Sequence, residues 1–228
     1  AAGVLSGPDA TEAEREATRI ELGLDQPPVT RYSDWLTGAL RGDLGTSMVS
    51  GRAVSDIVTG RLAASLTILA PAVAVIVVVA GVLGVVAGLR AGGRVDRALS
   101  SLTLGLVATP DFLIATALVL VFAVWLPIFP AVAIVPARQA LWQHPELVVL
   151  PSLALALGGF GSTMRLLRAT VAQVVETPYA EFARVNGFRG AAYIRTIVAN
   201  AAGPAIQSLT VMVAGMVGGG IVVETLFN

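Results

Sequence analysis

Four long apolar runs occupy the chain beyond residue 61 and predict helices that cross a membrane. The first run, 62–89, contains no charged residue, and the second, 98–127, contains only Asp111. The third and fourth runs lie at about 147–170 and 197–223. Because an α-helix rises about 1.5 Å per residue, each run is long enough to cross a hydrocarbon core of about 30 Å. We therefore expect an all-α integral membrane protein with four transmembrane helices.

Residues 1–61 form a separate polar segment, with six Arg and nine acidic residues. Thr11 is followed three residues later by Glu14, the spacing of a capping box, which predicts a short polar helix from Thr11 to Leu22. Five apolar residues further along recur at helical spacing: Tyr32, Trp35, Leu36, Ala39 and Leu40. This spacing predicts an amphipathic helix that lies on the membrane surface or on other helices.

The composition argues against a soluble globule and against most enzyme chemistry. Hydrophobic residues make up 55% of the chain and charged residues 13%, against roughly 25% charged residues in soluble domains. All fifteen basic residues are Arg, there is no Cys, and His144 is the one histidine. The chain therefore lacks a P-loop lysine, a Cys nucleophile and the two histidines of an HExxH zinc site. We expect no catalytic residue, no metal site and, at zero net charge, no nucleic-acid binding.

The distribution of Arg between the loops predicts the orientation in the membrane. The loop 90–97 carries three Arg and the loop 165–195 carries five, whereas 128–146 carries Arg138 alone. Because cytoplasmic loops are enriched in Lys and Arg, we expect the first two loops to be cytoplasmic and 128–146 to be extracytoplasmic. By alternation 1–61 is also extracytoplasmic, and a polar segment of this length needs a signal or an earlier transmembrane helix to cross the membrane.

A short helix is predicted within the loop 171–196. Thr177 suits the N-cap, Pro178 suits the first helical position, and Gly187 suits the position just after the end. One face of this helix carries Tyr179, Phe182, Ala183 and Asn186. Two aromatic side chains and a small residue on one face suit docking into a groove of another protein, and the alternative is an interfacial helix that lies on lipid.

Glycines mark two kinds of position in the predicted spans. Gly84 and Gly88 form a GxxxG pair, which predicts close packing against a neighbouring helix. The same reading applies to a second group: Gly158, Gly159 and Gly161. Three consecutive glycines follow in the fourth span: Gly218, Gly219 and Gly220. Each weakens a helix by about 1 kcal/mol relative to Ala, which makes this segment a candidate hinge.

Glu181-Phe182-Ala183, Gly187 and Ile197 follow a recognisable spacing in the 165–195 region and just beyond it. This segment resembles the EAA loop of bacterial ABC-importer permeases. That loop consists of a Glu-Ala-Ala triplet, three residues, Gly, nine residues and Ile. The segment departs from that pattern at Phe182, which replaces the second Ala, and at Ala199-Asn200, which replace a terminal Leu-Pro.

Further matching segments run along the whole chain. Within the polar segment they are Leu22 to Pro27, Arg31-Tyr32, Trp35-Leu36 and Gly42 to Ser47. Beyond it they are Tyr179, Ala183-Arg184, Gly187, Asn200-Ala201, Pro204, Val223-Glu224 and Phe227. With these residues the chain resembles the dipeptide and oligopeptide permeases of the ABC-importer family.

The resemblance implies a transport subunit of the inner membrane, with 62–228 as the permease domain and 171–196 as its coupling loop. Such permeases usually have six transmembrane helices, of which this chain would hold the second to the fifth, with one before Ala1 and one after Asn228. The implied partners are a second, paralogous permease subunit, two cytoplasmic ATPase subunits and an extracytoplasmic binding protein that delivers peptide. ATP and Mg²⁺ belong to the ATPase subunits, so this chain is expected to bind no cofactor itself.

The resemblance also implies roles for individual residues. The short helix becomes the coupling helix, and the residues expected to contact the ATPase are Tyr179, Glu181, Phe182, Ala183, Arg184 and Gly187. The resemblance matches no residue of known role to Asp111, which follows Pro110 and is the one charge deep in a predicted span. It either lines the translocation path and meets the amino terminus of a peptide, or caps the backbone that Pro110 frees at a kink.

Three alternatives stay open at this stage. The first is a permease of the same type that carries nickel, glutathione or another small solute. The second is a membrane scaffold or assembly protein with a partner-binding loop. The third is an intramembrane enzyme, which a single His, the lack of Cys and the lack of paired intramembrane carboxylates disfavour.

Overall fold

A computed structural model describes residues 11–21, 24–133 and 139–227 of the chain. Within these ranges the chain is helical and forms no named strand, in agreement with the predicted all-α class. The chain divides into two compact units, Ala1–Ala63 and Ala64–Asn228.

The first unit contains two short helices that the sequence predicts. In α2 (Glu12–Glu21), the Thr11 backbone N–H donates to Glu14 Oε2 at 2.8 Å, and the Glu14 N–H donates back to Thr11 Oγ1 at 3.4 Å. This capping box is confirmed, and the hydrogen bonds from the Thr11 N–H and hydroxyl lower the pKa of Glu14. Leu22, the predicted end of the helix, lies outside the described residues.

The second helix of this unit, α3 (Pro28–Leu40), carries the predicted apolar stripe. Tyr32 and Trp35 are both exposed, and their ring centroids lie 6.1 Å apart. Leu40 is also exposed. The amphipathic helix is confirmed as a helix, and its attachment to a membrane surface or to other helices stays a prediction.

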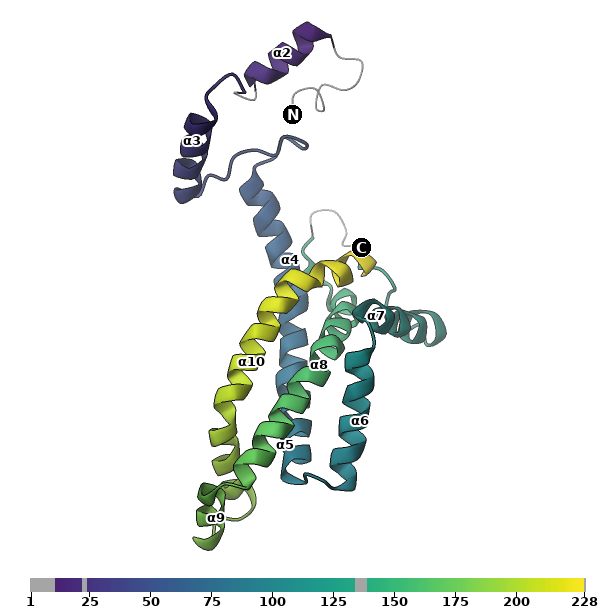
Figure 1. Cartoon of the computed structure of the whole chain (residues 1–228). Coiled ribbons are helices and arrows are strands. Elements are labelled where there is room, and N and C mark those ends of the chain that lie inside the picture. The colour runs from purple at the N-terminus through teal and green to yellow at the C-terminus, as the bar shows by residue number, and fades with distance from the viewer. Residues whose placement is uncertain (1–10, 22–23, 134–138, 228) are drawn as a thin grey trace. The chain divides into compact units, whose positions relative to one another are not determined.

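The helices of the second unit pack around α8 (Pro145–Val175), which contacts α5 (Gly81–Leu89), α6 (Arg94–Ala108), α7 (Asp111–Val119) and α10 (Gly190–Phe227) (Figure 1). The predicted glycine contacts explain how closely these helices approach. A Cβ atom at Gly88 would lie 2.6 Å from the Val171 Cβ, and one at Gly161 would lie 2.9 Å from the Thr103 carbonyl oxygen. Both glycines therefore sit where a larger residue would push neighbouring helices apart.

Three helical stretches in the described residues are long and apolar enough to cross a membrane: Val54–Leu89, Pro145–Val175 and Gly190–Val217. The first consists of α4 (Val54–Val75), the π-helical turn η1 (Ile76–Ala80) and α5. These stretches correspond to the first, third and fourth predicted spans, although each begins before the predicted residue. The last helix begins at Gly190, so most of the predicted loop 171–196 is itself helical.

The second predicted span, 98–127, differs from expectation. It forms two helices, α6 and a second one made of α7 and the π-helical turn η2 (Leu120–Trp125), with a bend of 101° between them. Pro110 has no N–H to donate and disfavours helical backbone in the residue before it, so Thr109 is extended at φ −94° and ψ 125°. The sequence therefore indicates where this helix weakens, but it does not predict the size of the bend.

Candidate functional site

The short helix of the predicted coupling loop forms where the sequence places it, as α9 (Pro178–Val185). Thr177 is the N-cap, and its Oγ1 accepts a hydrogen bond of 3.4 Å from the Ala180 N–H. Pro178 occupies the first helical position, where its missing N–H costs nothing. The predicted start of the helix is confirmed.

The end of α9 is a Schellman motif. The Phe188 N–H donates to the Ala183 carbonyl at 3.0 Å, and the Gly187 N–H donates to the Arg184 carbonyl at 3.1 Å. Gly187 adopts φ +83°, the left-handed conformation predicted for it. Apart from its two chain neighbours, no atom of the described residues lies within 4 Å of the place where a Cβ at Gly187 would be. The requirement for glycine here is therefore one of backbone conformation and not of space within the chain.

The two faces of α9 have opposite characters. Ala180 is fully buried and packs with Val171, Ile197 and Ala201 of α8 and α10. Ala183 is only 3% exposed, so the prediction that it lies on the partner-facing side is wrong. Residues three apart in a helix share a face, and both alanines are small enough to let α9 lie close to its neighbours.

The outward face of α9 exposes aromatic and aliphatic side chains next to charged ones. Phe182 is 65% exposed, and Tyr179 is half exposed beside it along the helix. Glu181 and Arg184 are also exposed, as predicted. Sequence reasoning missed two further exposed residues, Val185 and Phe188. Val185 could have been found, because it follows Phe182 by three residues, and its exposed fraction of 80% exceeds that of either aromatic.

An ion pair at the same end of the unit was also missed. Arg168 of α8 donates from Nε to Asp96 Oδ1 at 2.8 Å and from a terminal nitrogen to Asp96 Oδ2 at 2.5 Å. Asp96 is 3% exposed, and it also accepts from the Gly92 N–H at 2.8 Å and the Ser100 hydroxyl at 3.2 Å. In the sequence these residues count only as loop charges, and their pairing across 72 positions leaves no local pattern.

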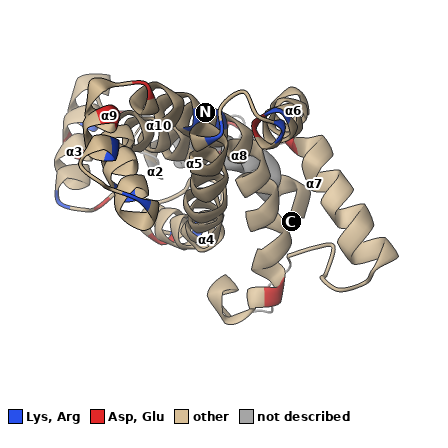
Figure 2. Cartoon of the chain, turned by 90° about the horizontal axis from the view of Figure 1, so that it is seen from below, with Lys and Arg blue, Asp and Glu red and all other residues tan. Residues whose placement is uncertain are grey.

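This ion pair brings the two Arg-rich loops to one end of the unit. Figure 2, viewed from the end that carries α9, shows basic segments beside α5, α6 and α9. In the predicted orientation both loops face the cytoplasm, which requires them to lie at the same end of the unit.

Asp111 begins α7 directly after the bend and lines a small cavity of about 190 Å³ with α8 and α10. Its other lining residues include Ser162, Gly158 and Met212. Within the residues that the structure describes, no N–H or hydroxyl donates to the Asp111 carboxylate. The alternative that Asp111 caps the freed backbone therefore has no hydrogen bond to support it, whereas its position on a cavity fits a lining residue.

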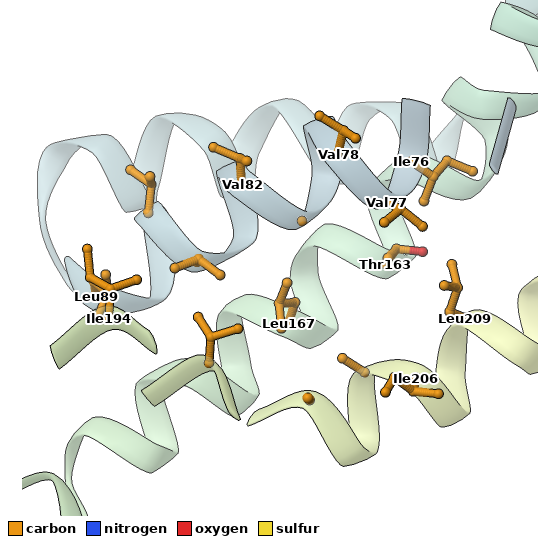
Figure 3. Close-up of a pocket in the computed structure, with 16 residues that line it drawn as sticks. Ile76, Val77, Val78, Val82, Leu89, Thr163, Leu167, Ile194, Ile206 and Leu209 are labelled. Atoms are coloured by element: carbon orange, nitrogen blue, oxygen red, sulfur yellow. The ribbon is translucent and has the colours of Figure 1, made fainter. Parts of the chain in front are cut away.

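A larger groove of about 680 Å³ lies between α5, α8 and α10 (Figure 3). Thr163 is the one polar residue of its lining, which is otherwise made of side chains such as Ile76, Leu167 and Ile206. Such a surface suits a neighbouring apolar helix or lipid chains and offers no partner to a polar solute. Of the two cavities, the one at Asp111 is the better candidate for part of a polar path.

The candidate hinge at Gly218, Gly219 and Gly220 lies inside α10, which continues through all three residues to Phe227. The helix is thus intact in this conformation, and hinge motion at these residues stays a prediction. Pro110, the other residue expected near the path, lies at the bend between α6 and α7.

Comparison with known proteins gives a consistent picture. A family model described as binding-protein-dependent transport system inner membrane component matches residues 80–228. The chain is 30% identical to a Brucella suis protein named as a peptide permease, over 96% of this chain and 70% of the relative. It is 29% identical to a Sinorhizobium fredii protein named as a peptide ABC transporter permease, over 100% of this chain and 73% of the relative.

A third relative is named for another substrate. The chain is 29% identical to the glutathione transport system permease protein of Escherichia coli, over 99% of this chain and 71% of the relative. The matches agree with the helical architecture and the apolar spans of the described residues. The chain therefore belongs to the family of binding-protein-dependent transport system inner membrane components and is a multi-pass permease subunit of an ABC importer.

Proposed function

We propose that this permease conducts di- and oligopeptides and that α9 couples it to cytoplasmic ATPase subunits. The observation that carries the coupling role is the two-sided character of α9. Its alanine face is anchored to α8 and α10, and its outward face exposes Tyr179 and Phe182. A helix held in this way can transmit a push from a docked protein to both long helices behind it.

The peptide substrate is supported by two independent points. Relatives that match nearly the whole chain are named as peptide permeases. The cavity at Asp111 offers a carboxylate, which complements the ammonium group at the amino terminus of a peptide. Glutathione, the substrate in the name of a third relative, is the second candidate, because it also carries a free ammonium group.

We propose the following partners: a paralogous permease subunit, two ATPase subunits that bind ATP and Mg²⁺, and a binding protein outside the membrane. In this arrangement ATP hydrolysis belongs to the partner subunits, and this chain contributes the path and the coupling helix. The loops 90–97 and 165–195 face the cytoplasm, while 1–61 and 128–146 face the other side.

The substrate is tested with the complete complex in proteoliposomes that contain ATP on the ATPase side. We expect the binding protein to stimulate accumulation of members of a defined di- to pentapeptide library, measured by mass spectrometry. Accumulation of glutathione but of no library peptide would replace the peptide proposal with the second candidate. Accumulation of neither would overturn the assignment of this cargo class.

The orientation is tested with single cysteines, because the chain has none of its own. Ala91 and Ala191 are exposed and avoid the positive φ of Gly190 and the close carbonyl beside Gly93. In intact cells with a permeabilised outer membrane, an impermeant thiol reagent should label Gln139→Cys and leave Ala91→Cys and Ala191→Cys unlabelled. The reverse labelling pattern would invert the proposed orientation.

A further inference from the structure

We propose that the Asp96–Arg168 ion pair is a positioning joint that makes α6 and α7 move with α8 when α9 is displaced. This inference rests on the proposed coupling role of α9. Asp96 and Arg168 lie outside α9, and through them the displacement of α9 reaches the part of the unit where Asp111 lies.

The contacts of α9 show which helices a push on it reaches first. This helix packs against α8 and α10; α7 in turn contacts both of these helices, whereas α6 contacts α8 and α5. The cavity at Asp111 is built from α7, α8 and α10 together. A push on α9 therefore reaches α8 and α10 directly, and it reaches Asp111 through the packing of α7 on these two helices and through α6, which the ion pair holds to α8.

The ion pair has the geometry of a rigid link. Both terminal oxygens of Asp96 accept from the Arg168 guanidinium, a two-bond arrangement that fixes orientation as well as distance. The Asp96 carboxylate also accepts hydrogen bonds from the Gly92 N–H, just before α6, and from the Ser100 hydroxyl within α6. The Asp96 carboxylate is buried, whereas the Arg168 side chain is 32% exposed, so water reaches the pair from the Arg168 side alone.

The position of the pair also fits the task. Arg168 lies on α8 ten residues before Pro178, where α9 begins, and Asp96 lies in the first turn of α6. Further along the same two helices, Gly161 brings α8 against the Thr103 carbonyl. The ion pair and this close contact together join α6 to α8 at two points, which leaves the bend at Pro110 as the place where α7 can change direction.

Purely structural and positioning roles are separated by a variant that keeps the helices packed. Asp96→Asn retains an acceptor for the Gly92 N–H, and Arg168→Met retains the unbranched apolar stem. The double variant leaves no unpaired buried charge, so we expect it to reach the membrane and to retain the ATPase subunits. Arg165→Gln is the matched control, because Arg165 is an exposed Arg one turn away with no ion pair among the described residues.

In proteoliposomes with the full complex and the defined peptide library, we expect the double variant to hydrolyse ATP near the wild-type rate. Transport per ATP hydrolysed should fall by about fivefold or more, the lower end of typical coupling between distant sites. A cysteine at Thr109, between α6 and α7, should change its thiol labelling on ATP addition in the otherwise unchanged chain and not in the double variant.

Three results would overturn the joint. The first is an unchanged ratio of transport to ATP hydrolysis in the double variant. The second is an equal fall of this ratio in Arg165→Gln. The third is loss of the double variant from the membrane, which would assign the pair to stability alone. The proposed function fails separately, when ATPase subunits do not depend on the exposed face of α9 for binding. A wild-type ratio combined with ATPase binding through Phe182 therefore rejects the joint and retains the coupling helix.

Discussion

The carboxylate of Asp111 lies against the backbone of Gly158, with Oδ1 only 2.6 Å from the point that a Cβ at residue 158 would occupy. Glycine on α8 thus makes room for the charged group at the start of α7. Since both residues line the same cavity, the position of the carboxylate depends on the absence of a side chain across from it.

Gly158→Ala should therefore impair transport by moving the Asp111 carboxylate, although Ala is the better helix former. We expect uptake of peptides to fall toward the level of an Asp111 variant, with normal amounts of protein in the membrane. Gly105→Ala is the control, because within the described part of the chain a Cβ at Gly105 meets no atom of another helix within 4 Å. Equal, wild-type uptake by both alanine variants would show that the approach of Asp111 to Gly158 has no role in transport.

Asp111→Asn keeps the size and an acceptor oxygen and removes the charge. A hydrogen bond to a charged group contributes about 1.5–3 kcal/mol, so uptake of peptides with a free amino terminus should fall about tenfold or more. Uptake of the same peptides with an acetylated amino terminus should change little. Uptake assays on matched free and acetylated tripeptides measure the difference, and an equal effect on both would remove the ammonium contact from the proposal.

Substitutions at Gly187 should rank by their tolerance of positive φ. Gly187→Val should cost about 1–2 kcal/mol of local stability at the end of α9, whereas Asn, which adopts this conformation more readily, should cost less. We expect transport and ATPase copurification to decline in the order Gly, Asn, Val. A Gly187→Asn variant that is as defective as Gly187→Val would point instead to a need for space against the ATPase.

Gly88→Ala should lower the stability of the second unit. A Cβ at Gly88 would lie 2.6 Å from the Val171 Cβ and 2.8 Å from the Arg168 carbonyl oxygen, and overpacking of this kind costs about 1–3 kcal/mol. Thermal unfolding of the purified permease in detergent measures the effect. Gly81 lies in the same helix, and a Cβ there meets no atom of the described neighbouring residues within 4 Å, so Gly81→Ala should be neutral or slightly stabilising. The prediction fails if the two variants unfold at the same temperature.

The sequence predicted those features that depend on local chemistry. The capping box at Thr11, the start of α9 after Thr177 and the positive φ of Gly187 all follow from residues within a few positions of one another. Long-range features were not predictable in this way. The Asp96–Arg168 pair and the contact between Asp111 and Gly158 join helices whose relative placement no local pattern specifies.

Burial was the other source of error. The sequence placed Ala183 on the same face as Phe182, but a short helix between two long ones has to bury one side, and the alanines are the residues that fit there. The bend at Thr109 was predictable only in part. Pro110 indicated its position, whereas the 101° angle depends on how α7 packs against α8 and α10.

The most direct test of the coupling helix is ATPase copurification with a Phe182→Asp permease. An exposed aromatic at the centre of a docking surface typically accounts for 2 kcal/mol or more of binding, so affinity for the ATPase should fall by about thirtyfold. Trp35→Asp, which changes an exposed aromatic of α3 instead, should leave ATPase copurification unchanged. The account predicts loss of the ATPase from the Phe182→Asp complex alone. Retention of the ATPase at the wild-type level by Phe182→Asp would contradict the assignment of α9 as the coupling helix.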